Sequence, residues 1–174
     1  VEEASEHLAV RQDVAEPPRL ATDRGAMLTV IHRGGLGYAA TSDLSRAGLR
    51  EAAERAVRLA SLTAGRSVVD YSSVPMPRPQ GQYRTAVARP AATLTRREKL
   101  DLLAGEASQC RVDDRIVDWE ATLWSTRTQQ LYLTADGGEV TQEFDFLVPY
   151  VAATAHADGE TQTRTHGGRY NGFC

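Results

Sequence analysis

The chain has 174 residues, 41% of them hydrophobic and 25% charged, a composition typical of a globular protein with one sizeable core or two small ones. A formal net charge of -3 argues against a nucleic-acid partner, and no apolar run approaches the roughly 20 residues of a membrane span. Two cysteines are too few for a disulfide framework, and the acidic N-terminus is unlike a targeting segment, so we expect a cytoplasmic protein without a membrane partner.

The first half of the chain contains its best-specified segment. Residues 1–23 combine weak helical signals with two adjacent prolines, and we assign them no structure. Because the chain starts at Val1 and not at a methionine, we expect it to begin inside a longer N-terminal segment. Residues 28–33 alternate along a β-branched strand, Gly34-Gly35 predicts a hairpin turn, and residues 36–40 predict the returning strand.

A helix is predicted after this hairpin. Ser45 is the expected N-cap, Gly65 is placed to end the helix, and Glu51 and Glu54 stand four residues before Arg55 and Arg58. The apolar stripe has the period of a helix and consists of Leu49, Ala52, Ala53, Ala56, Val57 and Ala60. Together these elements predict an N-terminal α/β unit at residues 1–65.

Residues 66–92 have the composition of a linker or a long extended loop. Four prolines, Pro75, Pro77, Pro79 and Pro90, cannot be accommodated in a helix or in a central strand. Such a long irregular loop is unusual inside a compact domain, so we expect a domain boundary here.

The second domain, predicted at residues 93–174, begins with a helix and continues as an antiparallel meander. Thr95 and Glu98 match a capping box, and the helix stripe consists of Leu100, Leu103, Ala104, Ala107 and Cys110. Strands are predicted at 116–123, 128–134, 140–146, 147–156 and 160–165, with turns at Asp136-Gly137-Gly138 and Asp158-Gly159. The fold class is therefore α+β: an N-terminal β-hairpin and helix unit followed by a small antiparallel-sheet domain packed on a helix.

Candidate chemistry is sparse. His156, His166 and Cys174 are a possible three-ligand metal set across the last hairpin, but sheet histidines more often make ordinary hydrogen bonds. Asp118 and Glu120 share a strand face and are a possible acid/base pair, although solvated carboxylates are the commoner explanation. The run from Gly34 to Gly37 leads into a strand and not a helix, so it does not predict a phosphate site. We therefore predict no catalytic residue and no metal ligand in this chain.

Two passages resemble the PmbA/TldD proteins, also named as modulators of DNA gyrase. The first is GYAATSDLS with its alanine-rich helix at residues 37–62, and the second begins with TLTRREKLDLL at 93–103 and continues through YLTADGGEVTQEF to HGGRYNGF. The resemblance extends from about Gly25 to Phe173, and its glycine-rich end is closer to the TldD branch.

The resemblance implies a cytoplasmic zinc metallopeptidase that acts on peptides or unfolded chains as a homodimer or a heterodimer with a related subunit. The family's zinc motif, His-Glu-x-x-x-His, lies on a C-terminal helix that this sequence lacks, so no zinc ligand is transferred to it. Because the chain stops on a glycine-rich run at Cys174, we expect either a cut or a longer gene product.

Two function classes stay open. The first is the non-catalytic N-terminal region of such a peptidase, which contributes to dimer assembly and to substrate passage, with Thr161, Thr163 and Thr165 as a sheet edge that receives an extended peptide. The second is a stand-alone module that binds a peptide or a partner without cutting it. A nuclease or a gyrase effector is disfavoured by the charge balance.

Overall fold

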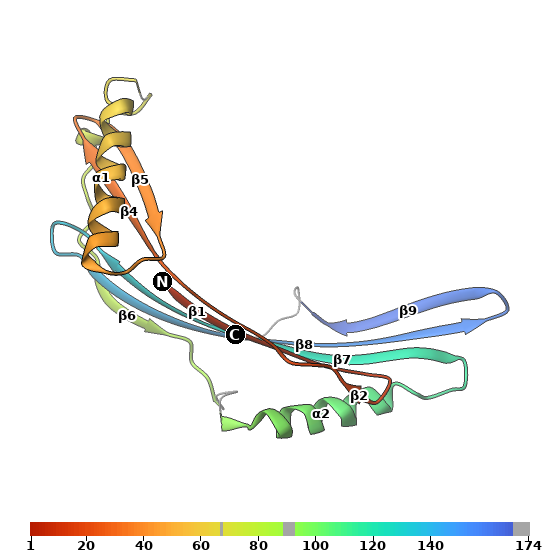
Figure 1. Ribbon diagram of the computed structural model, residues 1–174. Helices are drawn as coiled ribbons and strands as arrows, with labels where there is room; N and C mark the ends of the chain where they lie inside the picture. Colours follow the sequence, from red (N-terminus) through yellow and green to blue (C-terminus); the bar gives the residue numbers. More distant parts are fainter. Residues whose placement is uncertain (67, 89–92, 169–174) are drawn as a thin grey trace. The chain divides into compact units, whose positions relative to one another are not determined.

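The computed structural model describes residues 1–66, 68–88 and 93–168 of the chain (Figure 1). Its helices are α1 (Arg46–Thr63), the short 3-10 helix η1 (Tyr71–Ser73) and α2 (Arg96–Gln109). Its strands are β1 (Glu2–Arg11), β2 (Val14–Ala15), β3 (Arg19–Arg24), β4 (Ala26–His32), β5 (Gly35–Thr41), β6 (Gln80–Arg84), β7 (Ile116–Leu133), β8 (Glu139–Ala157) and β9 (Glu160–Gly167). The predicted α+β class is confirmed.

Among the described residues the strands form two sheets. A seven-stranded sheet has the order β2-β1-β7-β8-β6, with β3 paired to β1 and β9 paired to β8, and β4 and β5 form a separate antiparallel pair. The chain divides into two compact units: unit 1 is Val1–Glu2, Asp23–Tyr83 and Gln129–Gln142, and unit 2 is Glu3–Thr22, Arg84–Thr128 and Glu143–Cys174. The predicted domain limits at 66 and 92 stay a prediction.

In unit 1 the predicted hairpin forms, with its turn one residue earlier than expected. His32 pairs with Gly35, so Arg33 and Gly34 are the two turn residues, and their φ angles of 51° and 78° lie in the left-handed region. Positive φ at both central positions is the geometry that matches the twist of paired strands. Gly35 is therefore the first residue of β5 and does not belong to the turn.

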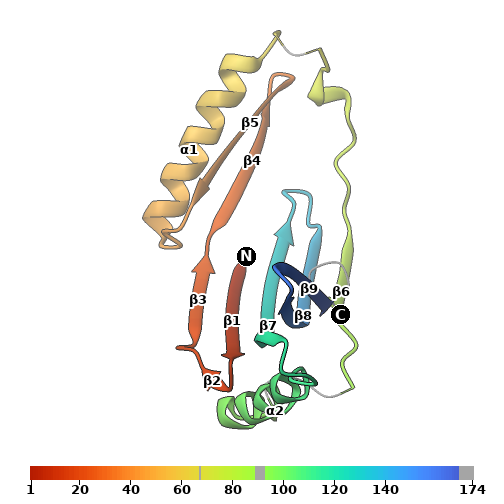
Figure 2. The same ribbon diagram turned by 90° about the vertical axis from the view of Figure 1, so that its right-hand side faces the viewer.

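Helix α1 packs closely on this hairpin, as Figure 2 shows. Ala52, Ala56 and Ala60 are fully buried on its inner face. A Cβ added at Gly35 would collide with the Ala60 carbonyl, and one added at Gly37 would collide with the Ala56 carbonyl and the Ala60 nitrogen. The glycines and alanines thus set how closely helix and strand approach, which explains the glycine-rich run without a ligand.

The predicted signals at the ends of α1 are confirmed. Ser45 is the N-cap and its hydroxyl accepts a hydrogen bond of 3.1 Å from the Gly48 amide, while Gly65, with φ of 69°, follows the last turn. Glu51 pairs with Arg55 as expected, but Glu54 pairs with Arg50 and not with Arg58.

Two stretches expected to be irregular contain strands. Strand β1 lies inside residues 1–23 and contributes Leu8 and Val10, the largest fully buried side chains, to the core of unit 2. Strand β6 lies inside residues 66–92, at the end of the sheet order, where prolines nearby cost no central ladder bonds.

Helix α2 covers the core of unit 2. Thr95 and Glu98 form the predicted capping box, and Leu103 and Ala107 are buried against Leu8, Val10, Ala121 and Leu123. None of the helices in the described residues is long and apolar enough to cross a membrane.

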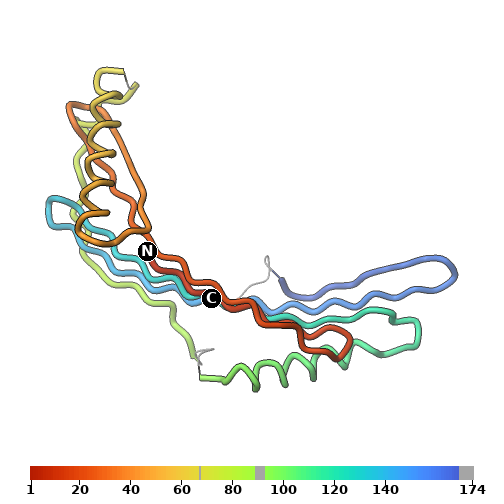
Figure 3. Tube along the Cα trace, viewed as in Figure 1, coloured from red at the N-terminus to blue at the C-terminus, as the bar shows by residue number. Residues whose placement is uncertain are grey.

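The long strands β7 and β8 replace four predicted shorter ones, and Figure 3 traces each as a continuous run. Residues 124–127, WSTR, contain no glycine, proline, asparagine or aspartate to break β7. The predicted strands 116–123 and 128–134 are therefore one strand, as are 140–146 and 147–156.

Candidate functional site

The predicted sheet edge at Thr161, Thr163 and Thr165 lies on β9. This strand pairs antiparallel with β8, in a register that places His156 opposite Thr161, Thr154 opposite Thr163 and Ala152 opposite Thr165. Asp158 and Gly159, with φ of 52° and 79°, form the two-residue turn between the strands, at the predicted position.

The same register determines which backbone groups of β9 face away from β8. In an antiparallel pair, opposed residues alternate between those that exchange hydrogen bonds and those that do not. The Gly168 amide donates to the Pro149 carbonyl at 2.8 Å, so this pair and every second pair from it are of the bonded kind. The three threonines belong to the other kind, and their N–H and C=O groups point to the outer edge.

Two further contacts agree with this assignment. The His156 amide donates to the Arg115 carbonyl at 2.8 Å, away from β9, as a residue of a non-bonded pair must. The hydroxyls of Thr154 and Thr163 lie 2.9 Å apart, and the Thr161 hydroxyl lies 2.8 Å from His156 Nδ1. Such short side-chain contacts are typical of non-bonded pairs, where side chains stand closer.

Within the described part of the chain, β9 pairs with β8 alone (Figure 1), and residues 160–166 are all exposed. A strand edge with unpaired outward amides and carbonyls is the structure that accepts another extended chain. One outward carbonyl is already occupied: Arg164 Nη1 donates to the Thr163 oxygen at 3.1 Å, and Arg164 Nη2 donates to Gln162 Oε1 at 3.2 Å.

The histidine pair does not form a metal site. His156 lies opposite Thr161 and His166 lies opposite Val151, so the two imidazoles are five residues apart along the hairpin, roughly 17 Å in a strand. Cys174 lies outside the described residues. Across 1–66, 68–88 and 93–168, no three His, Cys, Asp or Glu side chains are grouped as metal ligands.

The carboxylates near the start of β7 form ion pairs, not an acid/base dyad. Asp118 accepts two hydrogen bonds from Arg11, at 2.9 and 2.7 Å, and these lower its pKa. Hydrogen bonds from Arg115, side chain and backbone, hold the pKa of Asp113 at about 2. A carboxylate that is held by arginine and has a lowered pKa is a poor general acid near neutral pH, so the structure does not support the acid/base hypothesis for Asp118.

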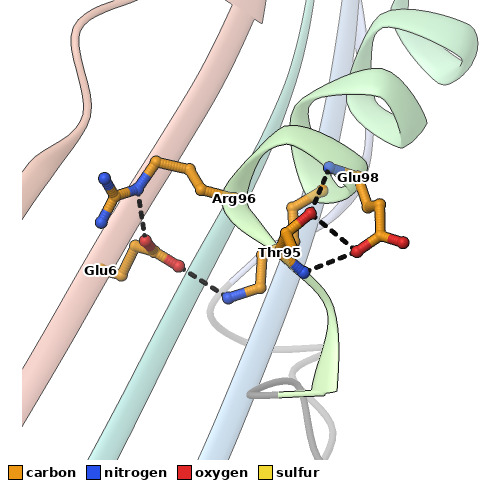
Figure 4. A network of polar contacts seen from close by, with 5 residues as sticks. Glu6, Thr95, Arg96 and Glu98 are labelled. Carbon is orange, nitrogen blue, oxygen red and sulfur yellow. Dashed lines mark hydrogen bonds and ion pairs between the residues drawn. The ribbon is translucent and has the colours of Figure 1, made fainter.

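Sequence reasoning missed a polar network between β1 and α2, drawn in Figure 4. Glu6 accepts from Lys99 Nζ at 2.7 Å and from Arg96 Nε at 2.9 Å. Burial raises the pKa of Glu6, but the hydrogen bonds and charges of Lys99 and Arg96 outweigh it, so the pKa lies below its ordinary value. This network fixes α2 on the sheet. Only the presence of a lysine among the apolar positions of α2 hinted at it.

Residues 1–60 match the family model described as PmbA/TldA metallopeptidase domain 1. No curated protein matches the chain. Solved structures share its fold, including the following three. A candidate modulator of DNA gyrase from Bacteroides thetaiotaomicron aligns with a TM-score of 0.71 and 17% identity, over 94% of this chain and 38% of its own.

Two further solved structures show the same fold. A candidate modulator of a DNA gyrase from Thermotoga maritima aligns with a TM-score of 0.60 and 14% identity, over 94% of this chain and 37% of its own. TldE from Thermococcus kodakarensis aligns with a TM-score of 0.62 and 17% identity, over 95% of this chain and 39% of its own. The chain thus spans less than half the length of these proteins. The first 60 residues thus match the first domain of the PmbA/TldA metallopeptidases, and the chain shares its fold with these solved structures.

Proposed function

We propose that this chain is the non-catalytic N-terminal region of a cytoplasmic TldD/PmbA-like zinc metallopeptidase that processes peptides and unfolded chains. The observation that carries the proposal is the match of residues 1–60 to a domain described as the first domain of a metallopeptidase. The chain's part is dimer assembly, with a copy of itself or a related subunit, and guidance of the substrate.

Zinc does not fit the residues that the structure describes, because they provide no group of three ligating side chains. We therefore assign hydrolysis to a part of the full-length protein outside this sequence, and derive no catalytic step from these residues. The solved relatives, of which this chain matches only 37 to 39%, have ample additional chain for such a site.

Substrate guidance rests on the β9 edge. Thr161, Thr163 and Thr165 direct their backbone donors and acceptors outward, and an extended peptide can add to them as a further strand. Recognition through backbone groups tolerates many side chains, which suits an enzyme that handles unfolded chains.

The second candidate function is a binding module that holds a peptide or a partner chain without cleaving it. The same exposed edge favours it, since strand addition needs no catalytic group. The two candidates share the edge and differ in whether the full-length protein contains a zinc site.

The first test uses the full-length natural protein. We expect a mass well above 19.0 kDa, about one zinc ion per chain, and hydrolysis of an unfolded, fluorescein-labelled polypeptide that stops on zinc chelation. A natural protein of 174 residues that neither contains zinc nor cleaves peptide would contradict the peptidase assignment and leave the binding module.

The second test addresses the edge with proline variants of the same protein. Thr163→Pro removes one outward N–H and should weaken the binding of a labelled peptide of alternating Thr and Val, measured by fluorescence anisotropy. Gln162→Pro is the matched control. The Gln162 N–H faces β8, so losing this N–H should destabilise the β8–β9 hairpin before it affects the outer edge. Unchanged affinity in Thr161→Pro, Thr163→Pro and Thr165→Pro alike would exclude this edge.

A further inference from the structure

The outer edge of β9 is not uniformly open. Of the carbonyls of Thr161, Thr163 and Thr165, the central one already accepts a hydrogen bond from the Arg164 guanidinium. The second arm of that guanidinium is held by Gln162, which stands two residues away on the same face of the strand. An incoming strand that pairs with Thr163 therefore competes with Arg164 for one acceptor.

Displacing an arginine from a carbonyl is favourable only where the guanidinium finds another acceptor. A carboxylate is the strongest one available, because the fork of an arginine matches its two oxygens. Val151 packs on the core beneath α2, so His166 opposite it lies on the same face of the sheet as α2. That face of β9 carries Glu160, Gln162, Arg164 and His166, and its positive charge is confined to the half near Arg164. A segment with an acidic side chain beside Arg164 complements that half, whereas a lysine there would be repelled.

Resting on the peptide-binding role proposed above, we propose that Arg164 makes the β9 edge selective for extended segments that bear a carboxylate opposite it. In the free chain the guanidinium caps the Thr163 carbonyl and protects the edge, as charged side chains do on other exposed strands. In the bound state it turns to the carboxylate of the added strand and releases the Thr163 carbonyl to accept a backbone N–H. Arg164 is thus a specificity-determining residue and not a catalytic one.

The test compares two labelled peptides of alternating Thr and Val that differ only at a central Glu or Gln. The full-length protein should bind the Glu peptide about threefold more tightly than the Gln peptide, since an exposed ion pair contributes little more, and added salt should reduce the difference. Arg164→Ala should abolish the preference and bind the Gln peptide more tightly than the unaltered protein does, because the competing donor is gone.

Arg58→Ala is the matched control, because it removes the same charge from exposed α1 and should leave the preference intact. Equal affinity for the two peptides, or a Glu preference that persists in Arg164→Ala, would overturn the role of Arg164 while leaving peptide binding in place. If neither protein binds either peptide, the edge proposal itself fails and the selectivity fails with it. Unchanged melting of Arg164→Ala establishes that its fold is intact.

Discussion

At the residue scale, one carboxylate links the N-terminal strand to the helix that covers it. Glu6 occupies an inward position of β1, and Lys99 and Arg96, which lie 93 and 90 residues away in the chain, neutralise it. A half-buried carboxylate without these partners would cost free energy on folding. The pair Glu6 and Lys99 therefore determines where α2 packs on the sheet, and it also stabilises that packing.

The pH dependence of stability follows from the lowered pKa of Glu6. Its contribution is fully present above the ordinary pKa of 4.5 and is lost as the pH falls through the lower pKa of the folded protein, since the unfolded chain binds the proton first. We expect Glu6→Gln to be less stable at neutral pH and to lose less stability on acidification. Urea unfolding at a series of pH values measures this, and parallel pH profiles for the two proteins would contradict it.

At the element scale, the contact of α1 with β5 depends on the absence of side chains. In Gly37→Ala the new methyl group would meet the backbone of α1 at Ala56 and Ala60, which cannot move without shifting the helix. We expect a loss of about 1 to 3 kcal/mol in unfolding free energy, as for other overpacked sites.

Gly105→Ala is the control for that variant. Gly105 lies in the exposed part of α2 with nothing within 4 Å of an added Cβ, so alanine should gain about 0.5 to 1 kcal/mol. Thermal unfolding followed by circular dichroism distinguishes the two. A neutral or stabilising Gly37→Ala would mean that α1 does not pack on β5 as described.

Elements with local signals were predictable from the sequence, and those that depend on distant partners were not. Ser45, the Thr95 capping box and the Asp158-Gly159 turn involve neighbours in the chain, and each is confirmed. Strand β1 was missed because Glu6 interrupts its apolar pattern at an inward position, and only the distant Lys99 makes that position tolerable.

The candidate site, like the fold, was predictable from the sequence only where its signals are local. The polar alternation of residues 160–165 indicated an edge strand, and β9 is one. Which backbone groups face outward depends on the register with β8, and the cap by Arg164 depends on a side-chain conformation. The periodicity of the sequence predicts neither the register nor this side-chain conformation. The metal hypothesis failed because placing two histidines on one hairpin does not place them opposite one another.

At the scale of the whole molecule, the two units differ in what they bury. In the described residues, the fully buried apolar side chains of unit 1 are all alanines, whereas unit 2 buries Leu8, Val10, Leu103 and Leu123. Larger buried side chains contribute more hydrophobic free energy, so unit 2 should be the more stable of the two.

Native-state hydrogen exchange tests this difference. Amides of α1 and β5 should exchange through openings of lower free energy than amides of β1 and the first half of β7, because local stability follows buried apolar contact. Mass spectrometry of peptic fragments provides the measurement. Equal protection of the two sets would indicate that unit 1 gains stability from a source other than its alanine core.

The position of Lys99 also determines what amine chemistry this sequence permits. It is the only lysine of the 174 residues, and its side chain is 10% exposed and bonded to Glu6. Acylating dyes, amine cross-linkers and enzymes that attach ubiquitin-like tags to lysine would thus find no accessible side chain here while α2 stays docked. Labelling of Lys99 becomes a reporter of that docking, since its amine is exposed to reagents only when the helix leaves the sheet.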